Sequence, residues 1–357
     1  MDILVIALAA VALWGVSFSL RGHEDYLSRE STGSVKGIFA VIILYSHMRG
    51  YVTIPPTGSY IYSSLLGFLG QLMVVMFLLY SGYGVMEGVK KDRARYVGNF
   101  LTHRLLKVWI MFAMAVALFF ILAVATGQEY SPAEYLLCWT GWESIGNSNW
   151  FVFDILVLYL LTYVALRGAD YLRLGPGHVV VAVYLLTFVF LLFLMVAGKG
   201  GWWYDTVLAY PTGMLFSIYR GRIENALRGW RWVVGAVVCG ALFFFLQYGT
   251  QTLDRMLPGR LAAYLGLAGY LTASSVFALL VVMITMKLKF DNAVLRWLGV
   301  NAFAIYILQR LAMIVCAHYG INGRPLLFSA IVIPSTLLIA ALFTSFTGKV
   351  NRKLFKG

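Results

Sequence analysis

The sequence has few charged residues and no polar linker. Only 12% of its 357 residues are charged, about half of the roughly 25% typical of soluble domains. In contrast, 61% are hydrophobic, and the mean hydropathy is +0.81. Apolar runs of about 18 residues or more predict transmembrane helices. Because no Pro/Ser-rich or charged segment divides the chain, we expect one all-α, polytopic membrane domain over residues 1–357.

Cysteine and the common catalytic signatures are also scarce. The three cysteines lie far apart and form no CxxC, which argues against a disulfide framework or a structural zinc site. No GxSxG, HExxH, Walker A or dinucleotide-glycine motif occurs. His23, His178 and His318 make no metal-like spacing with His47. We therefore predict no metal site.

Long apolar runs predict eleven transmembrane helices. A span of nineteen residues rises about 28 Å, enough to cross the hydrocarbon core. The expected spans are roughly 2–20, 35–52, 60–87, 105–126, 149–166, 178–197, 202–219, 232–249, 261–286, 297–317 and 326–347.

The basic residues set the expected orientation. Of the 28 Lys and Arg residues, 22 fall on one side of the alternating spans, five fall on the other, and Arg310 lies within a span. Positive charge gathers in cytoplasmic loops, so we expect a cytoplasmic C-terminus and an outer N-terminus. The net charge of +13 is thereby explained by topology, without nucleic acid as a partner.

The outer loop 127–148 contains three glutamates and no Lys or Arg. Ser131 and Glu134 predict a capping box at the start of a short helix. Aromatic residues then follow at helical spacing: Tyr135, Trp139 and Trp142. The pattern is typical of an interfacial helix, which either anchors the bundle at the membrane surface or covers an outward-facing site as a lid.

Ionisable residues within spans need a reason, because each costs about 2.5–3.5 kcal/mol on insertion scales. His47 lies eleven residues after Lys36, about 16 Å along a helix and on nearly the same face. A neutral imidazole there can take a proton from a hydroxyl near pH 7. A histidine that is simply hydrogen-bonded between helices is the alternative.

Two further segments mark the predicted cytoplasmic side. Ser81 and Gly82 interrupt an apolar run, which permits either close helix packing or a path for a ligand. Arg104 and Lys107, three residues apart, share a helical face at the start of the fourth span. Paired cations there favour a phosphate or nucleotide site, although topology alone also supplies basic residues at such positions.

Polar residues recur in the fifth and tenth spans. Asp154 lies one turn inside the fifth span, which Trp150 opens, and could pair with a cation, orient His47 or stay solvated near the interface. The tenth span carries Asn301, Tyr306 and Gln309. Polar side chains in lipid normally face the bundle, where they line a site or join helices.

Taken in order, these segments resemble the acyltransferase 3 family of integral membrane acyltransferases. The matching features are a basic residue and a histidine eleven apart (Lys36, His47), "FLLYSGYG", "FLTHRLLK", Trp150 with Asp154 and Tyr159, and "LGVNAFAIYILQ". The resemblance covers about residues 33–348. Residues 1–32 form an extra N-terminal helix and cytoplasmic loop, and residues 349–357 a basic cytoplasmic tail.

Several positions depart from the family pattern. Lys36 and Lys107 stand where arginine is frequent, which keeps the charge but loses the bidentate fork. Asp154 replaces a glutamate and Asn301 a serine. Gln309 replaces a terminal histidine and cannot titrate, so only a hydrogen-bonding role survives at that position.

The resemblance implies transfer of an acyl group, with acetyl expected, from cytoplasmic acyl-CoA to a hydroxyl of an envelope carbohydrate or related acceptor. It places the protein in the bacterial cytoplasmic membrane. The implied general base is His47, with Asp154 beside it. The implied donor-binding residues are Lys36, Ser81, Gly82, Tyr83, Arg104 and Lys107, and the implied acceptor-binding residues are Trp150, Asn301, Tyr306 and Gln309.

Two alternatives remain open from the sequence. A transporter of a small polar solute or acyl group could use the same fold without chemistry, but transporters are often built from internal repeats, and the two halves show no convincing repeat. A purely structural subunit would not explain why the intramembrane ionisable residues line up.

Overall fold

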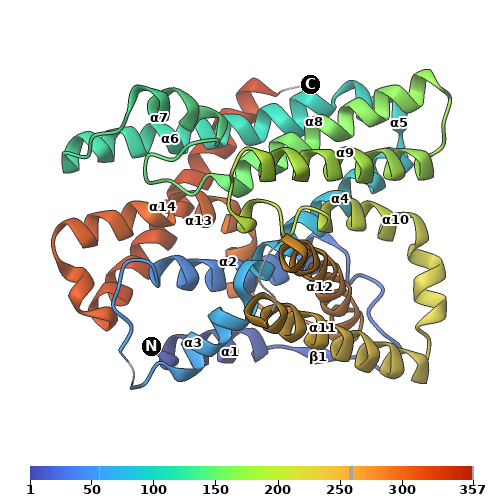
Figure 1. The fold of residues 1–357 in the computed structure, drawn as a ribbon, viewed down its shortest axis with the longest axis horizontal. Helices are drawn as coiled ribbons and strands as arrows, with labels where there is room; N and C mark the ends of the chain where they lie inside the picture. The colour runs from blue at the N-terminus through green and yellow to red at the C-terminus, as the bar shows by residue number, and fades with distance from the viewer. Residues whose placement is uncertain (56, 257–259, 356–357) are drawn as a thin grey trace.

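The computed structural model describes residues 1–55, 57–256 and 260–355, and these are almost entirely helical (Figure 1). Residues 356–357 of the predicted basic tail lie outside the described ranges. The long helices are α2 (Arg29–Met48), α4 (Val75–Lys91), α6 (Lys107–Thr126), α8 (Trp150–Tyr171), α9 (Pro176–Val196), α10 (Ala209–Ala226), α11 (Trp230–Met256), α12 (Arg260–Lys287), α13 (Ala293–His318) and α14 (Pro325–Leu354).

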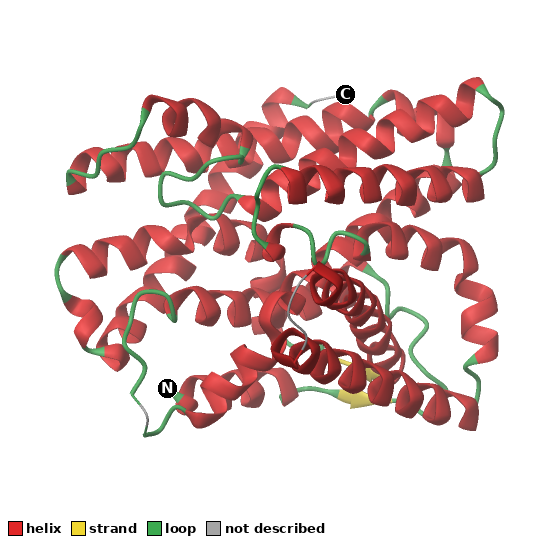
Figure 2. Ribbon diagram, viewed as in Figure 1, coloured by secondary structure: helices red, strands yellow, loops and turns green. Residues whose placement is uncertain are grey.

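Short elements join these helices. Figure 2 shows that the strands make up only one small ribbon. The short elements are α1 (Asp2–Leu13), β1 (Ser17–Phe18), α3 (Tyr60–Leu69), η1 (Gly70–Val74), α5 (Arg93–Gly98), the π-helical turn η2 (Leu101–Leu106), α7 (Pro132–Leu137), η3 (Cys138–Thr140), η4 (Gly201–Trp203), β2 (Leu288–Lys289) and η5 (Ile321–Gly323).

Within the described residues, eight helical segments are long and apolar enough to cross a membrane. They are Tyr60–Lys91, Leu101–Thr126, Trp150–Tyr171, Pro176–Val196, Trp230–Thr250, Tyr264–Lys287, Ala293–His318 and Pro325–Leu354. The chain is therefore a multi-pass helical membrane protein. Of the other three expected spans, α1 has only 12 residues, while α2 and α10 are helical but carry charged residues toward one end. The count of eleven and the orientation stay predictions.

The helices differ from the expected spans at three places. The segment expected at 60–87 breaks at Gly70, where a φ of 48° ends α3 and a 3-10 turn redirects the chain into α4. The segment expected at 202–219 becomes a long helix only from Ala209. The first helix ends at Leu13 instead of continuing to residue 20, because β1 pairs with β2 in an antiparallel ribbon.

Two close helix crossings build the part of the bundle that contains the predicted site residues. Helix α2 packs along α13, where a Cβ on Gly299 would lie 2.1 Å from the carbonyl oxygen of Gly33. Helix α4 packs along α10, where a Cβ on Gly82 would lie 1.9 Å from the carbonyl oxygen of Tyr210. Small residues at such crossings allow backbones to approach closely. The structure thus gives Gly82 a packing role.

We expect Gly82→Ala to lower the free energy of unfolding by about 2 kcal/mol or more, because the added methyl group would force α4 and α10 apart. Gly84→Ala is the matched control on the same helix, since its Cβ would meet only the Arg104 side chain, at 3.9 Å. Thermal unfolding in detergent measures both variants. Equal stability of the two would contradict the packing role of Gly82.

The predicted capping box is present in α7. The backbone N–H of Ser131 donates to Glu134 Oε2 at 2.7 Å, and Ser131 Oγ accepts from the Glu134 N–H at 3.2 Å. The backbone hydrogen bond from Ser131 holds the pKa of Glu134 below its usual value. The rings of Tyr135 and Trp139 both stack on Phe120 of α6, with centroids 5.1 and 5.4 Å away. This aromatic face therefore packs on protein.

Candidate functional site

A cavity of 670 Å³ lies between α2, α4, α8 and α13, beside the π-helical turn η2. It lies toward the end of the bundle where α2 and α13 begin. Its polar lining residues are Arg29, Glu30, Thr32, Lys36, Tyr80, Ser81, Tyr83, Arg104, Tyr159 and Arg296. Four of the six predicted donor-binding residues are thus brought together from three segments that are distant in sequence.

The charge of this cavity is mainly positive. Four Arg or Lys side chains line it against one acid, Glu30. Arg296 forms an ion pair with Asp291, whereas Lys36 and Arg104 form none within the described ranges. Arg104 Nε donates to the Tyr96 hydroxyl at 3.0 Å, which fixes its guanidinium. A cavity of this charge can hold phosphate groups through charge-assisted hydrogen bonds.

Lys107 does not share this cavity with Arg104. Its side chain is exposed, and it is absent from the lining. The reason is the π-helical turn, which places more residues in each turn than an α-helix does. Residues three apart are therefore turned further from each other, and the common face expected for Arg104 and Lys107 is lost. Gly82, buried against α10, is absent from the lining as well.

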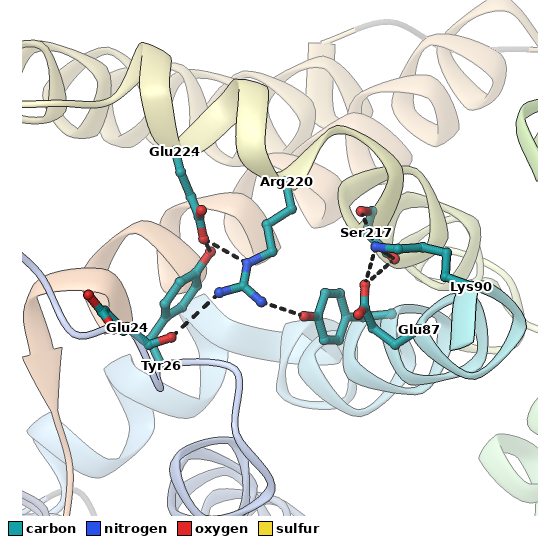
Figure 3. Close-up of polar contacts among 8 residues, drawn as sticks. Glu24, Tyr26, Glu87, Lys90, Ser217, Arg220 and Glu224 are labelled. Carbon is teal, nitrogen blue, oxygen red and sulfur yellow. Dashed lines mark hydrogen bonds and ion pairs between the residues drawn. The ribbon is translucent and has the colours of Figure 1, made fainter. Parts of the chain in front are cut away.

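Hydrogen bonds hold the remaining polar groups of the wall. The hydroxyl groups of Ser81 and Tyr159 lie 2.7 Å apart, which joins α4 to α8. The Tyr83 hydroxyl accepts from Arg220 Nη1 at 3.0 Å. Figure 3 shows this arginine between α4 and the Tyr26–Glu224 pair. The wall formed by α4 is therefore tied both to α8 and to α10.

His47 lies further along α2, outside the cavity lining, and is half-buried. Gln309 of α13 contacts its Nδ1 at 2.6 Å, and the Tyr306 ring lies 6.2 Å away. The Tyr306 ring in turn meets Phe151 at 5.4 Å, and Phe151 lines the cavity. Two aromatic rings thus stand between the basic cavity and the imidazole.

The Gln309 amide selects a tautomer of His47. Its nitrogen donates to the Tyr306 carbonyl oxygen at 3.0 Å and contacts His47 Nδ1, while its oxygen is buried without a partner. In this arrangement Nδ1 accepts and Nε2 carries the proton. A half-turn of the amide would place its oxygen on a protonated Nδ1 and leave the Nε2 lone pair free. Only that second state can accept a proton from a hydroxyl.

We expect Gln309→Leu to lower the rate of acyl transfer by about tenfold, because His47 would lose the partner that orients its ring. Gln309→Glu should retain transfer, since a carboxylate oxygen accepts from a protonated Nδ1 and leaves Nε2 free. Initial rates of both variants in the same detergent test this. A fully active Gln309→Leu variant would mean that this contact does not position the base.

The other residues predicted for the catalytic and acceptor-binding roles make no hydrogen bond to His47 that the structure shows. Asp154 is buried, and neither of its carboxylate oxygens has a hydrogen-bond partner, so it makes no bond to His47. The Asn301 amide is also buried and donates to the Trp297 carbonyl oxygen within α13. Trp150 packs against Phe151, with ring centroids 6.1 Å apart. Trp150 is thus adjacent to the aromatic pair, whereas Asn301 makes a bond local to its own helix.

A family model described as an acyltransferase domain matches residues 34–345, nearly the whole chain. This chain belongs to the acyltransferase 3 family. Searches among curated proteins and among solved structures found no match. The resemblance predicted from the motifs is confirmed, and membership indicates a membrane acyltransferase in general terms. Within the described ranges, no three His, Cys, Asp or Glu side chains converge in a way that could hold a metal.

Three residues of this candidate site did not enter the sequence prediction of site residues. Arg29 and Arg296 line the cavity but count in the sequence as topology signals. Arg310 follows Gln309, and its Nε is buried without a partner. A signal for Arg310 existed, since the sequence places this basic residue well inside a predicted span, far from both of its ends.

Proposed function

We propose that this protein transfers an acyl group, with acetyl expected, from cytoplasmic acyl-CoA to a hydroxyl of an envelope carbohydrate or a related acceptor. One observation carries the proposal: a basic cavity and a histidine lie along the same helix, α2, with an aromatic pair between them. Lys36 and His47 are separated by about 16 Å along that helix. Cations suit the phosphates of the donor, and the imidazole suits the hydroxyl of the acceptor.

In the proposed reaction His47 removes the proton from the acceptor hydroxyl. The oxygen then attacks the thioester carbonyl carbon, a C–O bond forms, and the C–S bond breaks. The CoA sulfur leaves and receives a proton, which His47 can return. Gln309 orients the imidazole, while Lys36 and Arg104 hold the phosphates at the cytoplasmic side. Phe151 and Tyr306 keep the basic cavity apart from the base until the acyl end of the donor enters.

The test is mass spectrometry of cell-envelope glycans from cells with and without the gene, together with CoA release from acetyl-CoA by the purified protein. We expect an acylated glycan species only in cells with the gene, and CoA release that depends on His47. Identical glycans in both strains, with no CoA released by the purified protein, would contradict the proposal.

A transporter of a small polar solute or acyl group is the competing function. It requires no thioester cleavage, and it would tolerate loss of the base. Solute uptake that persists in a His47→Ala variant, without any CoA release by the unaltered protein, would therefore favour transport over acyl transfer.

A further inference from the structure

A second cavity, of 910 Å³, adjoins the first one and has no role in the reaction proposed above. The loop between β1 and α2, the end of α10, the start of α11 and the end of α12 form its walls. The lining residues that carry charge are Arg21, Glu24, Arg220, Glu224, Arg228 and Lys287. With four Arg or Lys side chains against two glutamates, this cavity is also positively charged.

Two of these cations are already engaged, and two are free. Arg220 forms an ion pair with Glu224 at 2.7 Å, and Lys287 donates to the Leu20 carbonyl oxygen. Arg21 and Arg228 are exposed and form no ion pair within the described ranges. Free arginines at a cavity can bind phosphate groups with two hydrogen bonds each.

A flat apolar surface lies beside these charges. Trp232 lines the cavity, its indole N–H donates to the Met283 carbonyl oxygen at 2.9 Å, and its ring is partly exposed. An indole fixed in this way offers a face on which a planar base can stack. Phosphate-binding arginines next to an indole suit a phosphorylated nucleoside.

The two cavities share a thin wall. Tyr83 lines the first cavity and Arg220 the second, and the Tyr83 hydroxyl accepts from Arg220 Nη1 at 3.0 Å. Figure 3 shows the Arg220 guanidinium on this boundary, with Tyr26 and Glu224 on its other side. A single extended ligand could therefore occupy both cavities by passing over this boundary.

We infer that the second cavity binds the nucleotide end of the acyl donor, a 3′-phosphorylated adenosine, while the first cavity binds its diphosphate and pantetheine arm. This inference rests on the proposed function. If the thioester is to reach His47, the phosphates remain near Lys36 and Arg104, and the adenosine extends beyond them toward Arg21, Arg228 and Trp232. A lipid headgroup offers the same phosphate chemistry without a planar base, and the test separates the two.

The test compares a whole donor with a truncated one. In Arg228→Glu, we expect the KM for acetyl-CoA to rise by about tenfold, as expected for loss of a charge-assisted hydrogen bond, with kcat unchanged. The KM for S-acetylpantetheine, which lacks the nucleotide, should stay the same. Arg231→Glu is the matched control, because Arg231 is exposed on α11 three residues later and lines neither cavity.

Binding of adenosine 3′,5′-bisphosphate gives a readout that needs no reaction. We expect it to raise the melting temperature of the unaltered protein and of Arg231→Glu, but not of Arg228→Glu. A shift produced by phosphatidylglycerol vesicles but not by the bisphosphate would overturn the inference in favour of a lipid site. Equal effects of Arg228→Glu on both donors would overturn it as well. If no thioester is cleaved but the bisphosphate shift depends on Arg228, the nucleotide site stands and the proposed acyl transfer fails.

Discussion

Replacing His47 with alanine is expected to reduce acyl transfer by about 10²–10⁴-fold, the contribution typical of a positioned general base. Gln309 contacts Nδ1 of the His47 imidazole at 2.6 Å, and this contact orients the ring. Without the imidazole, the acceptor hydroxyl would have to attack the thioester without a base. Transfer of radiolabelled acetyl from acetyl-CoA to envelope glycans measures the loss.

A loss of transfer in His47→Ala indicates a base role only if the variant keeps its fold and its donor cavity. His47 lies outside the cavity lining, and Lys36 and Arg104 remain in place, so thermal stabilisation by CoA should be unchanged. Acceptor modification at the level of the unaltered protein in His47→Ala would contradict a base role for this histidine.

Replacing Arg104 with alanine should raise the KM for acetyl-CoA by about tenfold to a hundredfold, the range expected when a charge-assisted hydrogen bond is lost. Arg104 lines the cavity, has no carboxylate partner within the described residues, and is held by the Tyr96 hydroxyl at 3.0 Å. The thermal shift that CoA produces in the unaltered protein should shrink in parallel.

Lys107→Ala is the matched control for Arg104→Ala. It removes a cation from the same basic segment, and thus has the same effect on net charge and topology, but its side chain is exposed outside the cavity. We expect its KM for acetyl-CoA to stay within about twofold of the unaltered protein, as for surface charges in general. If Lys107→Ala impairs donor binding as much as Arg104→Ala does, the cavity does not define the donor site.

The sequence predicted those features that depend on periodicity and composition. Long apolar runs predicted the helices, and the eleven-residue spacing predicted one helix for Lys36 and His47, which both lie on α2, although only Lys36 lines the cavity. The capping box at Ser131 and Glu134 was also predictable, because it is a local pattern of backbone donors and side-chain acceptors.

Features that depend on local distortion or tertiary contact were not predictable. The π-helical turn separates Arg104 from Lys107, although an α-helix of the same sequence would put them on one face. The contact that gives Gly82 its role comes from Tyr210, which lies far away in sequence. The positions of Arg29 and Arg296 in the cavity likewise follow from packing, since near a membrane surface their charge already has a topological explanation.

The contact between Trp109 and the segment after α7 has a consequence for how this protein meets the bilayer. The indole N–H of Trp109 donates to the Trp139 carbonyl oxygen at 3.0 Å. Trp109 lies 17 residues before the end of α6 at Thr126, about 25 Å along the helix axis. The chain that leaves α6 must therefore turn back and descend most of the way along it.

Residues 132–140, which the sequence places in an external loop, thus lie alongside a candidate membrane span instead of beyond its end. Such a segment must satisfy its own polar groups, because hydrocarbon offers none. Here the Trp139 carbonyl oxygen has an indole donor, and the Thr140 hydroxyl donates to the Leu137 carbonyl oxygen at 2.7 Å. With Tyr135 and Trp139 stacked on Phe120, lifting this segment would cost two aromatic contacts and a hydrogen bond, about 2–4 kcal/mol. The lid that the sequence leaves open as a role for this segment would have to break these contacts in order to move.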